Sequence, residues 1–289
     1  MGPWASPHAD SATGGLPQVT TGQILLGCAI LLVWTGGFVL TVAAVASPRL
    51  RERLWPDGGR GQPPSLRGAL IGAAAFLGLF IATVALLKEP LRALGGWGVV
   101  AAGFVSQAVI LVAVALSVTT GAAQGLKSLG LGGWRPRHAL SSASAWLCSA
   151  WMVFAAALVC FGVYYLIARR PPPAMPVARI LPQLSAGQQL ALGALAVLVA
   201  PVCEELLFRG VIFGSLRARL GFWPAATASG VLFGAIHLSP VHVLPLAVLG
   251  VALAWVYERT GSLWTSVGLH AIQNATVMAL FFTRSLWGG

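Results

Sequence analysis

The stretch Pro201-Val202-Cys203-Glu204-Glu205-Leu206-Leu207-Phe208-Arg209-Gly210 places two adjacent carboxylates and an arginine inside an apolar run from Gln189 to Leu216. The whole chain has only seven Asp and Glu residues, and two of them stand side by side here. An ionisable group at membrane depth costs on the order of several kcal/mol, so such groups are rare and usually functional. We therefore take this stretch as the centre of a functional site.

The composition is that of a membrane protein. Hydrophobic residues make up 57% of the 289 residues and charged residues only 9%, and the mean hydropathy is +0.82. A soluble globular domain carries about 25% charged residues. The sequence therefore predicts a chain whose main partner is the lipid bilayer.

The formal net charge of +11 has two explanations. A basic surface can bind nucleic acid, but no basic stripe with interleaved aromatic residues occurs. Arginines in the loops of a membrane protein give the same excess, because cytoplasmic loops are rich in Lys and Arg. We adopt the second explanation and expect no nucleic-acid partner.

Eight apolar segments are long enough to mark as helices, since a span needs about 20 residues. The fold class expected is all-α, a polytopic membrane helix bundle with about eight transmembrane helices. The fifth segment is longer than a bilayer needs, whereas the seventh is short, contains Pro245, and is expected to be kinked or to span only partly. The segments are 22–46, 66–87, 97–120, 139–168, 188–216, 222–239, 242–257 and 262–283.

A proline-rich linker from Arg169 to Pro182 divides the chain. Before it, no span carries a charge in its interior, and after it nearly every span does. We therefore expect a disordered N-terminal segment at 1–21, a transmembrane scaffold of about four spans at 22–170, and a functional core of about four spans at 185–285. GxxxG pairs at Gly68/Gly72, Gly210/Gly214 and Gly230/Gly234 would permit close helix packing.

The loop charges predict the orientation. One side of the predicted bundle collects most of the basic residues, and this side should be cytoplasmic, with both termini outside. Arg169, Arg170 and Arg179 fall on the other side and conflict with this count. The richer side comprises Arg49, Arg51, Arg53, Arg60, Arg67, Lys127, Arg135, Arg137, Arg217, Arg219 and Arg259.

The four cysteines, Cys28, Cys148, Cys160 and Cys203, all lie in apolar runs and no CxxC motif occurs. Cysteines in such surroundings act as small hydrophobic residues. The sequence therefore predicts neither a disulfide framework nor a cysteine metal site.

Two carboxylates on the fifth segment should play different parts. Glu205 and Arg209 are four residues apart, so on a helix they share a face and can form a supporting ion pair. Glu204 lies roughly 100° round the helix and points elsewhere. A structural role explains Glu205 but explains Glu204 poorly, because its nearby cation is already paired.

Further polar residues follow on later spans. His237 shares a helical face with Phe233 on the sixth segment, and His270 shares one with Asn274 on the eighth. Each alone would be explained by interhelical hydrogen bonding. Their coincidence with Glu204 in one short core favours a functional site.

These residue types suit hydrolysis of an amide by water. A buried carboxylate can act as general base, a neutral histidine can help to hold the water, and Asn and His N–H groups can stabilise an oxyanion. No Ser or Cys with an evident adjacent base competes, and neither GxSxG nor HExxH occurs.

Glu-Glu-x-x-x-Arg, Phe-x-x-x-His and His-x-x-x-Asn, in this order on successive helices, resemble the motifs of the CPBP (ABI) family of type II CAAX prenyl endopeptidase-like intramembrane proteases. The resemblance covers roughly residues 185–285. It implies a glutamic endopeptidase without a cofactor, in which Glu204 activates water with help from His237. It also implies that Glu205 and Arg209 support the site and that His270 and Asn274 form the oxyanion site.

Two alternatives remain open. Glu204, His237 and His270 have the ligand types of a zinc site, although the usual His-x-x-x-His spacing is absent. The same polar core would also suit a non-enzymatic binding or immunity protein or a transporter. The composition, rich in Ala, Gly and Arg, predicts a bacterial plasma-membrane protein. For the peptidase, we expect the substrate to be a membrane-associated or lipophilic peptide or protein, prenylated or not.

Overall fold

A computed structural model describes residues 21–58, 62–121 and 125–287. The disorder predicted for residues 1–21 therefore concerns residues outside the described part, apart from Thr21, where the first helix begins. Arg60, counted above among the basic loop residues, also lies outside it.

Every regular element in the described part of the chain is helical, so the predicted fold class is confirmed. The N-terminal elements are α1 (Thr21–Ala46), α2 (Pro48–Leu54), α3 (Leu66–Ala93), α4 (Gly96–Thr120), η1 (Leu126–Leu129) and α5 (Pro136–Ala168). The linker contains α6 (Pro176–Ile180) and η2 (Leu181–Gln183). The C-terminal elements are α7 (Ala186–Ala194), η3 (Leu195–Val199), α8 (Ala200–Glu205), η4 (Leu206–Phe213), α9 (Gly214–Leu220), α10 (Phe222–Ala235), η5 (Pro240–His242), α11 (Val243–Thr260) and α12 (Leu263–Trp287).

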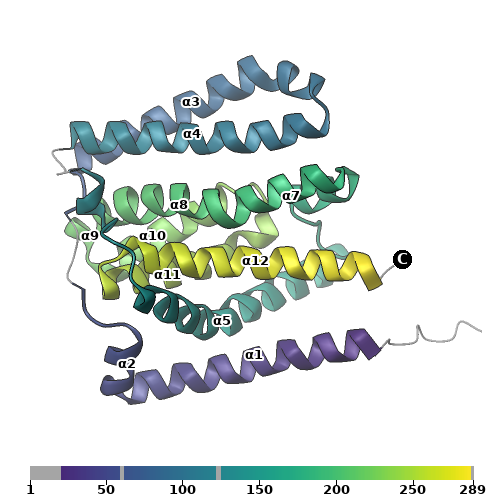
Figure 1. The fold of residues 1–289 in the computed structure, drawn as a ribbon, viewed down its shortest axis with the longest axis horizontal. Coiled ribbons are helices and arrows are strands. Elements are labelled where there is room, and N and C mark those ends of the chain that lie inside the picture. The colour runs from purple at the N-terminus through teal and green to yellow at the C-terminus, as the bar shows by residue number, and fades with distance from the viewer. Residues whose placement is uncertain (1–20, 59–61, 122–124, 288–289) are drawn as a thin grey trace, which may run out of the picture.

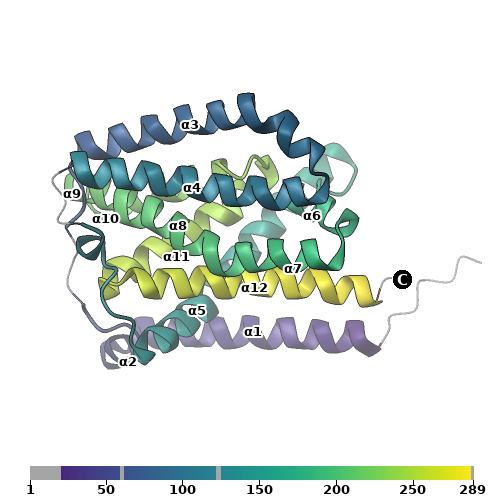
Figure 2. The same ribbon diagram turned by 45° about the horizontal axis from the view of Figure 1, so that its top comes forward.

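The helices pack as a layered bundle, with α3 and α4 along one side and α1 along the opposite side (Figures 1 and 2). The elements from α7 to α12 lie between them. Helix α4 packs against α7 and α8, and α5 packs against both α11 and α12. The N-terminal helices therefore hold the C-terminal core from two sides.

Six helices in the described part are long and apolar enough to cross a membrane: Leu25–Ala46, Leu66–Ala93, Gly96–Thr120, Pro136–Ala168, Ala186–Leu220 and Pro240–Thr260. The protein is thus an integral membrane protein, and about eight spans is an approximate number. The short helix is the sixth predicted segment, since α10 has 14 residues and covers only about 21 Å. The seventh segment was expected to be kinked or to span only partly. This expectation was wrong, because Pro245 stands in the first turn of α11, where proline is tolerated.

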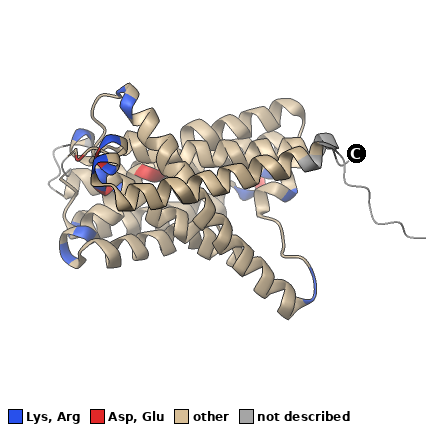
Figure 3. Cartoon of the chain, turned by 90° about the horizontal axis from the view of Figure 1, so that it is seen from below, with Lys and Arg blue, Asp and Glu red and all other residues tan. Residues whose placement is uncertain are grey.

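Both ends of the described chain lie at the same end of the bundle, where α1 begins and α12 finishes (Figure 1). The Lys and Arg residues gather mainly at the opposite end (Figure 3). This distribution agrees with the chain directions inferred from the loops. The cytoplasmic orientation of the basic end stays a prediction.

The linker is not a free connection between two halves. Leu181 and Leu184 are buried and pack with Val100, Leu192 and Leu195 in a small apolar cluster. The linker therefore packs against both α4 and α7 at the end of the bundle opposite the basic end.

The fifth span is one continuous helical rod from α7 to α9, with two π-helical segments, η3 and η4, on either side of α8. Pro201, the second residue of α8, has no N–H, and its ring conflicts with the carbonyl four residues earlier. The wider turn of η3 lies directly before it and relieves this conflict. Such π-helical turns are frequent at functional sites.

Glycines let two helix pairs approach closely, as the GxxxG pairs predicted, and let a third helix approach the loop before α3. A Cβ on Gly72 would lie 2.6 Å from the Ala113 carbonyl oxygen on α4. A Cβ on Gly230 would lie 2.7 Å from the Ala247 carbonyl oxygen on α11, and one on Gly214 would lie 2.7 Å from Pro63. These contacts are with backbone atoms or with a rigid proline ring, which cannot move aside. The close packing therefore requires a residue without a side chain at each position.

Replacing Gly230 by Ala is therefore expected to destabilise the protein by about 1–3 kcal/mol, because overpacking pushes α10 away from α11. Gly78→Ala on α3 is the matched control, since nothing lies within 4 Å of its added Cβ. This control should be neutral or stabilising, because Ala favours helix over Gly by about 1 kcal/mol. Thermal unfolding in detergent measures both, and equal effects of the two substitutions would contradict the close approach.

Candidate active site

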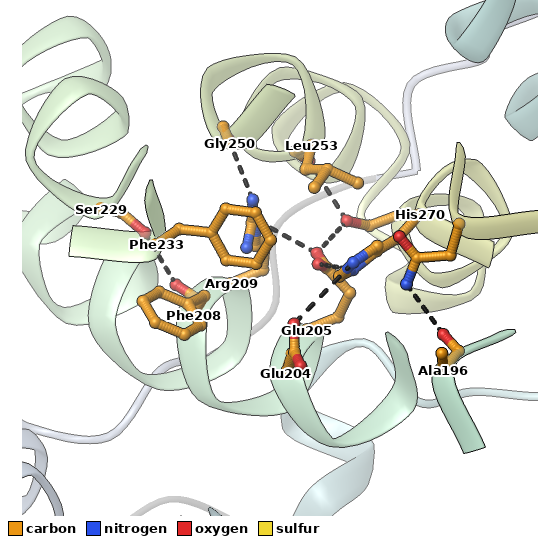
Figure 4. A network of polar contacts seen from close by, with 12 residues as sticks. Ala196, Glu204, Glu205, Phe208, Arg209, Ser229, Phe233, Gly250, Leu253 and His270 are labelled. Carbon is orange, nitrogen blue, oxygen red and sulfur yellow. Dashed lines mark hydrogen bonds and ion pairs between the residues drawn. The ribbon is translucent and has the colours of Figure 1, made fainter. Parts of the chain in front are cut away.

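Glu205 is the buried centre of a polar network (Figure 4). Its side chain is 0% exposed, and its Oε2 lies 3.1 Å from Arg209 Nε, so the predicted ion pair is present. Its Oε1 lies 3.0 Å from His270 Nδ1. The Ser266 hydroxyl donates to Oε2. Because both carboxylate oxygens have partners, Glu205 is held in one position.

Arg209 is also fully buried, and its neighbours compensate its charge. Its Nη2 donates to the Gly250 carbonyl on α11 at 3.1 Å. Its Cζ lies 4.9 Å from the ring centroid of Phe233 on α10, a cation–π distance. Arg209 therefore ties the fifth span to both α10 and α11.

Glu204 differs from its neighbour in exposure and in partners. Its side chain is 14% exposed, and its Oε2 lies 3.8 Å from His270 Nε2. That distance is an electrostatic contact and is too long for a direct hydrogen bond. Glu204 is thus a carboxylate in the polar network that keeps part of its surface accessible.

His270 lies between the two carboxylates, on α12. An ionised carboxylate only accepts hydrogen bonds, so Nδ1–H donates to Glu205. This leaves Nε2 facing Glu204, where it can donate only when the ring carries both protons. Glu205 therefore fixes the orientation of the His270 ring with respect to Glu204.

Asn274 stands one turn beyond His270 on the same face of α12. Its Nδ2 donates to the Ala196 carbonyl, in the π-helical segment η3, at 2.8 Å. An amide nitrogen has two protons, so one donor remains. Asn274 thus links α12 to the fifth span before the start of α8.

His237 joins the network through Phe233. It follows the C-terminal end of α10, and its Nδ1 lies 2.8 Å from the Phe233 carbonyl oxygen. The Phe233 ring makes edge contacts with both histidines, 5.0 Å from His237 and 5.4 Å from His270 between centroids. The half-buried His237 therefore neighbours the site with an aromatic ring packed against both imidazoles.

The three residues proposed as zinc ligands, Glu204, His237 and His270, do not form a ligand cluster. In the part of the chain that the structure describes, no group of three or more His, Cys, Asp or Glu side chains is arranged to hold a metal ion. The donor set therefore gives zinc no geometric support. The four cysteines are free thiols.

Two residues of the network were not singled out from the sequence as site residues. Ser266 precedes His270 by four positions, so the spacing of Ser266, His270 and Asn274 on one helical face was a usable signal. Phe233 was noted only as a partner of His237, whereas its ring is the common contact of Arg209, His237 and His270.

Replacing Ser266 by Ala is expected to cost about 1–3 kcal/mol of stability, because the buried carboxylate loses a hydrogen-bond donor. Ser144→Ala is the matched control. Ser144 is also buried, but its hydroxyl bonds only carbonyls of its own helix, Leu140 and Ser141. Chemical unfolding in detergent should separate the two variants, and an equal small effect would contradict the Ser266 contact.

The fold and this network define a polytopic, all-helical membrane protein with a buried carboxylate site. Residues 186–276 match the family model described as type II CAAX prenyl endopeptidase Rce1-like. The matched segment contains the Glu-Glu-x-x-x-Arg, Phe-x-x-x-His and His-x-x-x-Asn motifs. Residues 186–276 are thus similar to the Rce1-like family, and the resemblance recognised from these motifs is confirmed for this segment.

Three curated proteins illustrate the similarity. The chain is 34% identical over 83 residues to "Putative membrane peptidase YdiL" of Bacillus subtilis (strain 168), covering 29% of this chain and 34% of that protein. It is 33% identical over 78 residues to "UPF0177 protein YxdF" of Lactococcus lactis subsp. lactis (strain IL1403), covering 27% and 42%. It is 33% identical over 138 residues to an "Uncharacterized 24.3 kDa protein" of Escherichia coli, covering 46% and 63%.

The chain therefore spans about one third of the length of the first of these relatives and less than two thirds of the length of the other two. No solved structure matches the chain. The family model is described as a prenyl endopeptidase, and one of the relatives is named as a putative membrane peptidase.

Proposed function

We propose that the chain is an intramembrane endopeptidase that hydrolyses peptide bonds with a water molecule activated by Glu204. One observation carries the proposal: of two adjacent carboxylates, Glu205 is fully buried and held by three side chains, whereas Glu204 stays partly exposed beside His270. A general base must be reached by water and must not be locked in other contacts. Glu204 meets both conditions.

The neighbouring groups have supporting parts in this mechanism. Glu204 takes a proton from water, whose oxygen attacks the scissile carbonyl carbon. His270, fixed by Glu205, faces Glu204 and can donate from Nε2 to the oxyanion when it carries both protons. The remaining amide proton of Asn274 is a second donor for the oxyanion. His237 assists from the edge of the site.

The tetrahedral intermediate then collapses with cleavage of the C–N bond, and the proton on Glu204 passes to the departing amine, so that the carboxylate is regenerated with each turnover. The reaction needs no covalent intermediate. The substrate class is a membrane-associated or lipophilic peptide or protein, because the carboxylates lie on a membrane-spanning rod. We place the enzyme in a bacterial plasma membrane, since the relatives above come from bacteria.

The test uses the purified full chain in detergent with a library of membrane-proximal peptides, prenylated and unprenylated. Cleavage by the wild type and none by Glu204→Gln is the expected result. Cleavage of prenylated members alone would identify a CAAX-type substrate. The assay is repeated with a chelator, and the bound metal content is measured by elemental analysis.

Two outcomes would replace the proposal. Loss of cleavage with chelator, together with stoichiometric zinc, would make the protein a zinc peptidase. Peptide binding without cleavage by the wild type, unchanged in the folded Glu204→Gln variant, would point to a non-enzymatic binding or immunity protein.

A further inference from the structure

A large cavity lies away from the carboxylate network, between α1, α2, α5, α10 and α11. Its volume is about 830 Å³, and most of the side chains that line it are apolar. Glu204, His237, His270 and Asn274 are not among its lining residues. A cavity of this size with few polar groups is typical of a site for a small apolar molecule.

The cavity follows helix α11 for most of its length. It is lined from Leu244 to Arg259, a distance of about 22 Å along the helix axis. Arg259 stands in the last turn of α11 and so marks one end of the cavity. Trp55 and Trp255 line this end, as tryptophans do at a membrane interface. The cavity thus runs from the interface into the bilayer.

Lipid can reach the cavity from the side. Val45 on α1 is 72% exposed, and Trp223 and Val231 on α10 are also exposed, yet all three line the cavity. Exposed apolar side chains on a membrane-spanning bundle face the bilayer. A lipid chain can therefore enter between α1 and α10.

The polar end of the cavity is basic. Arg51, on the last turn of α2, lines the cavity, and in the part of the chain that the structure describes its side chain makes no ion pair or hydrogen bond. Arg259 is paired with Glu52 and Asp57. Arg51 therefore supplies an uncompensated positive charge, and a guanidinium binds phosphate oxygens well.

We propose that this cavity binds one anionic phospholipid, with an acyl chain along α11 and the phosphate on Arg51. The apolar walls fit the acyl chain, and the positive charge of Arg51 selects a negatively charged headgroup. The same helix presents Gly250 and Leu253 to Arg209 and Ser266 in the carboxylate network. A bound lipid would therefore support α11 from its other face.

The test measures lipid binding and does not depend on cleavage. The full chain in detergent is mixed with phosphatidylglycerol or with phosphatidylcholine of the same acyl chains, and bound lipid is counted by native mass spectrometry. The wild type is expected to retain phosphatidylglycerol about tenfold better, since the phosphate–guanidinium contact is charge-assisted and the choline ammonium cancels the negative charge of the phosphate in phosphatidylcholine. Arg51→Gln should remove this preference, whereas Arg49→Gln, on the same helix and outside the cavity, should keep it.

A bulky substitution tests the apolar part. Ala252→Phe projects into the cavity and should reduce retention of both lipids, whereas Ala73→Phe on the exposed face of α3 should not. Equal retention of the two lipids by the wild type would overturn the proposal and show that ordinary bilayer lipid fills the space. Equal losses in Arg51→Gln and Arg49→Gln would overturn it as well.

Discussion

Glu204→Gln is expected to lower kcat for peptide cleavage by about 10²–10⁴-fold, the contribution of a general base. The amide keeps the shape of the side chain but cannot accept the proton of the attacking water. Stability should change by no more than about 0.5 kcal/mol, because Glu204 is partly exposed and its contact with His270 is 3.8 Å long. Single-turnover cleavage and thermal unfolding on the same preparation measure both effects.

The matched control is Glu89→Gln. Glu89 is an exposed carboxylate that pairs with Arg92 on its own helix, far from the network in the sequence. It should leave both cleavage and unfolding unchanged. Retained cleavage by Glu204→Gln would remove Glu204 from the mechanism, whatever the behaviour of the control.

Arg209→Met is expected to destabilise the protein by about 3–5 kcal/mol, because it leaves the charge of Glu205 buried without its cation. The substitution also removes the hydrogen bond to Gly250 and the contact with the Phe233 ring. Unfolding in detergent at increasing temperature or denaturant measures the loss. Arg92→Met, which breaks an exposed ion pair, should cost no more than about 1 kcal/mol.

The double variant Glu205→Gln/Arg209→Met should recover most of this loss. Removing both charges abolishes the uncompensated carboxylate, and a buried ion pair is often replaced by neutral groups at little cost. A double-mutant cycle isolates the coupling of the two side chains. If the double variant were as unstable as the sum of both single variants, the pair would contribute nothing by mutual compensation.

The ion pair could be predicted from the sequence because its two members lie four residues apart on one rod, and local helix geometry is enough to bring them together. The same geometry separated Glu204 from Glu205. The π-helical segments could not be predicted, since they depend on how the chain around Pro201 accommodates a missing N–H and a steric conflict. Periodicity of apolar residues does not carry that information.

Contacts between different spans were harder to predict from the sequence. Whether His270 faces Glu204, Glu205 or both depends on the rotation of α12 against the fifth span, which the sequence of either helix alone does not specify. The position of Phe233 over Arg209 likewise follows from the close packing of α10 on α11 at Gly230. The length of α10 was misjudged because hydropathy marks apolar residues and says little about where a helix ends.

The central claim is that two adjacent carboxylates do different work, Glu204 in the chemistry and Glu205 in the structure. Measuring cleavage rate and unfolding midpoint together for Glu204→Gln and Glu205→Gln tests it most directly. For Glu204→Gln we expect loss of cleavage activity at an unchanged unfolding midpoint. For Glu205→Gln we expect a strongly lowered unfolding midpoint. A folded, inactive Glu205→Gln beside an active Glu204→Gln would contradict it.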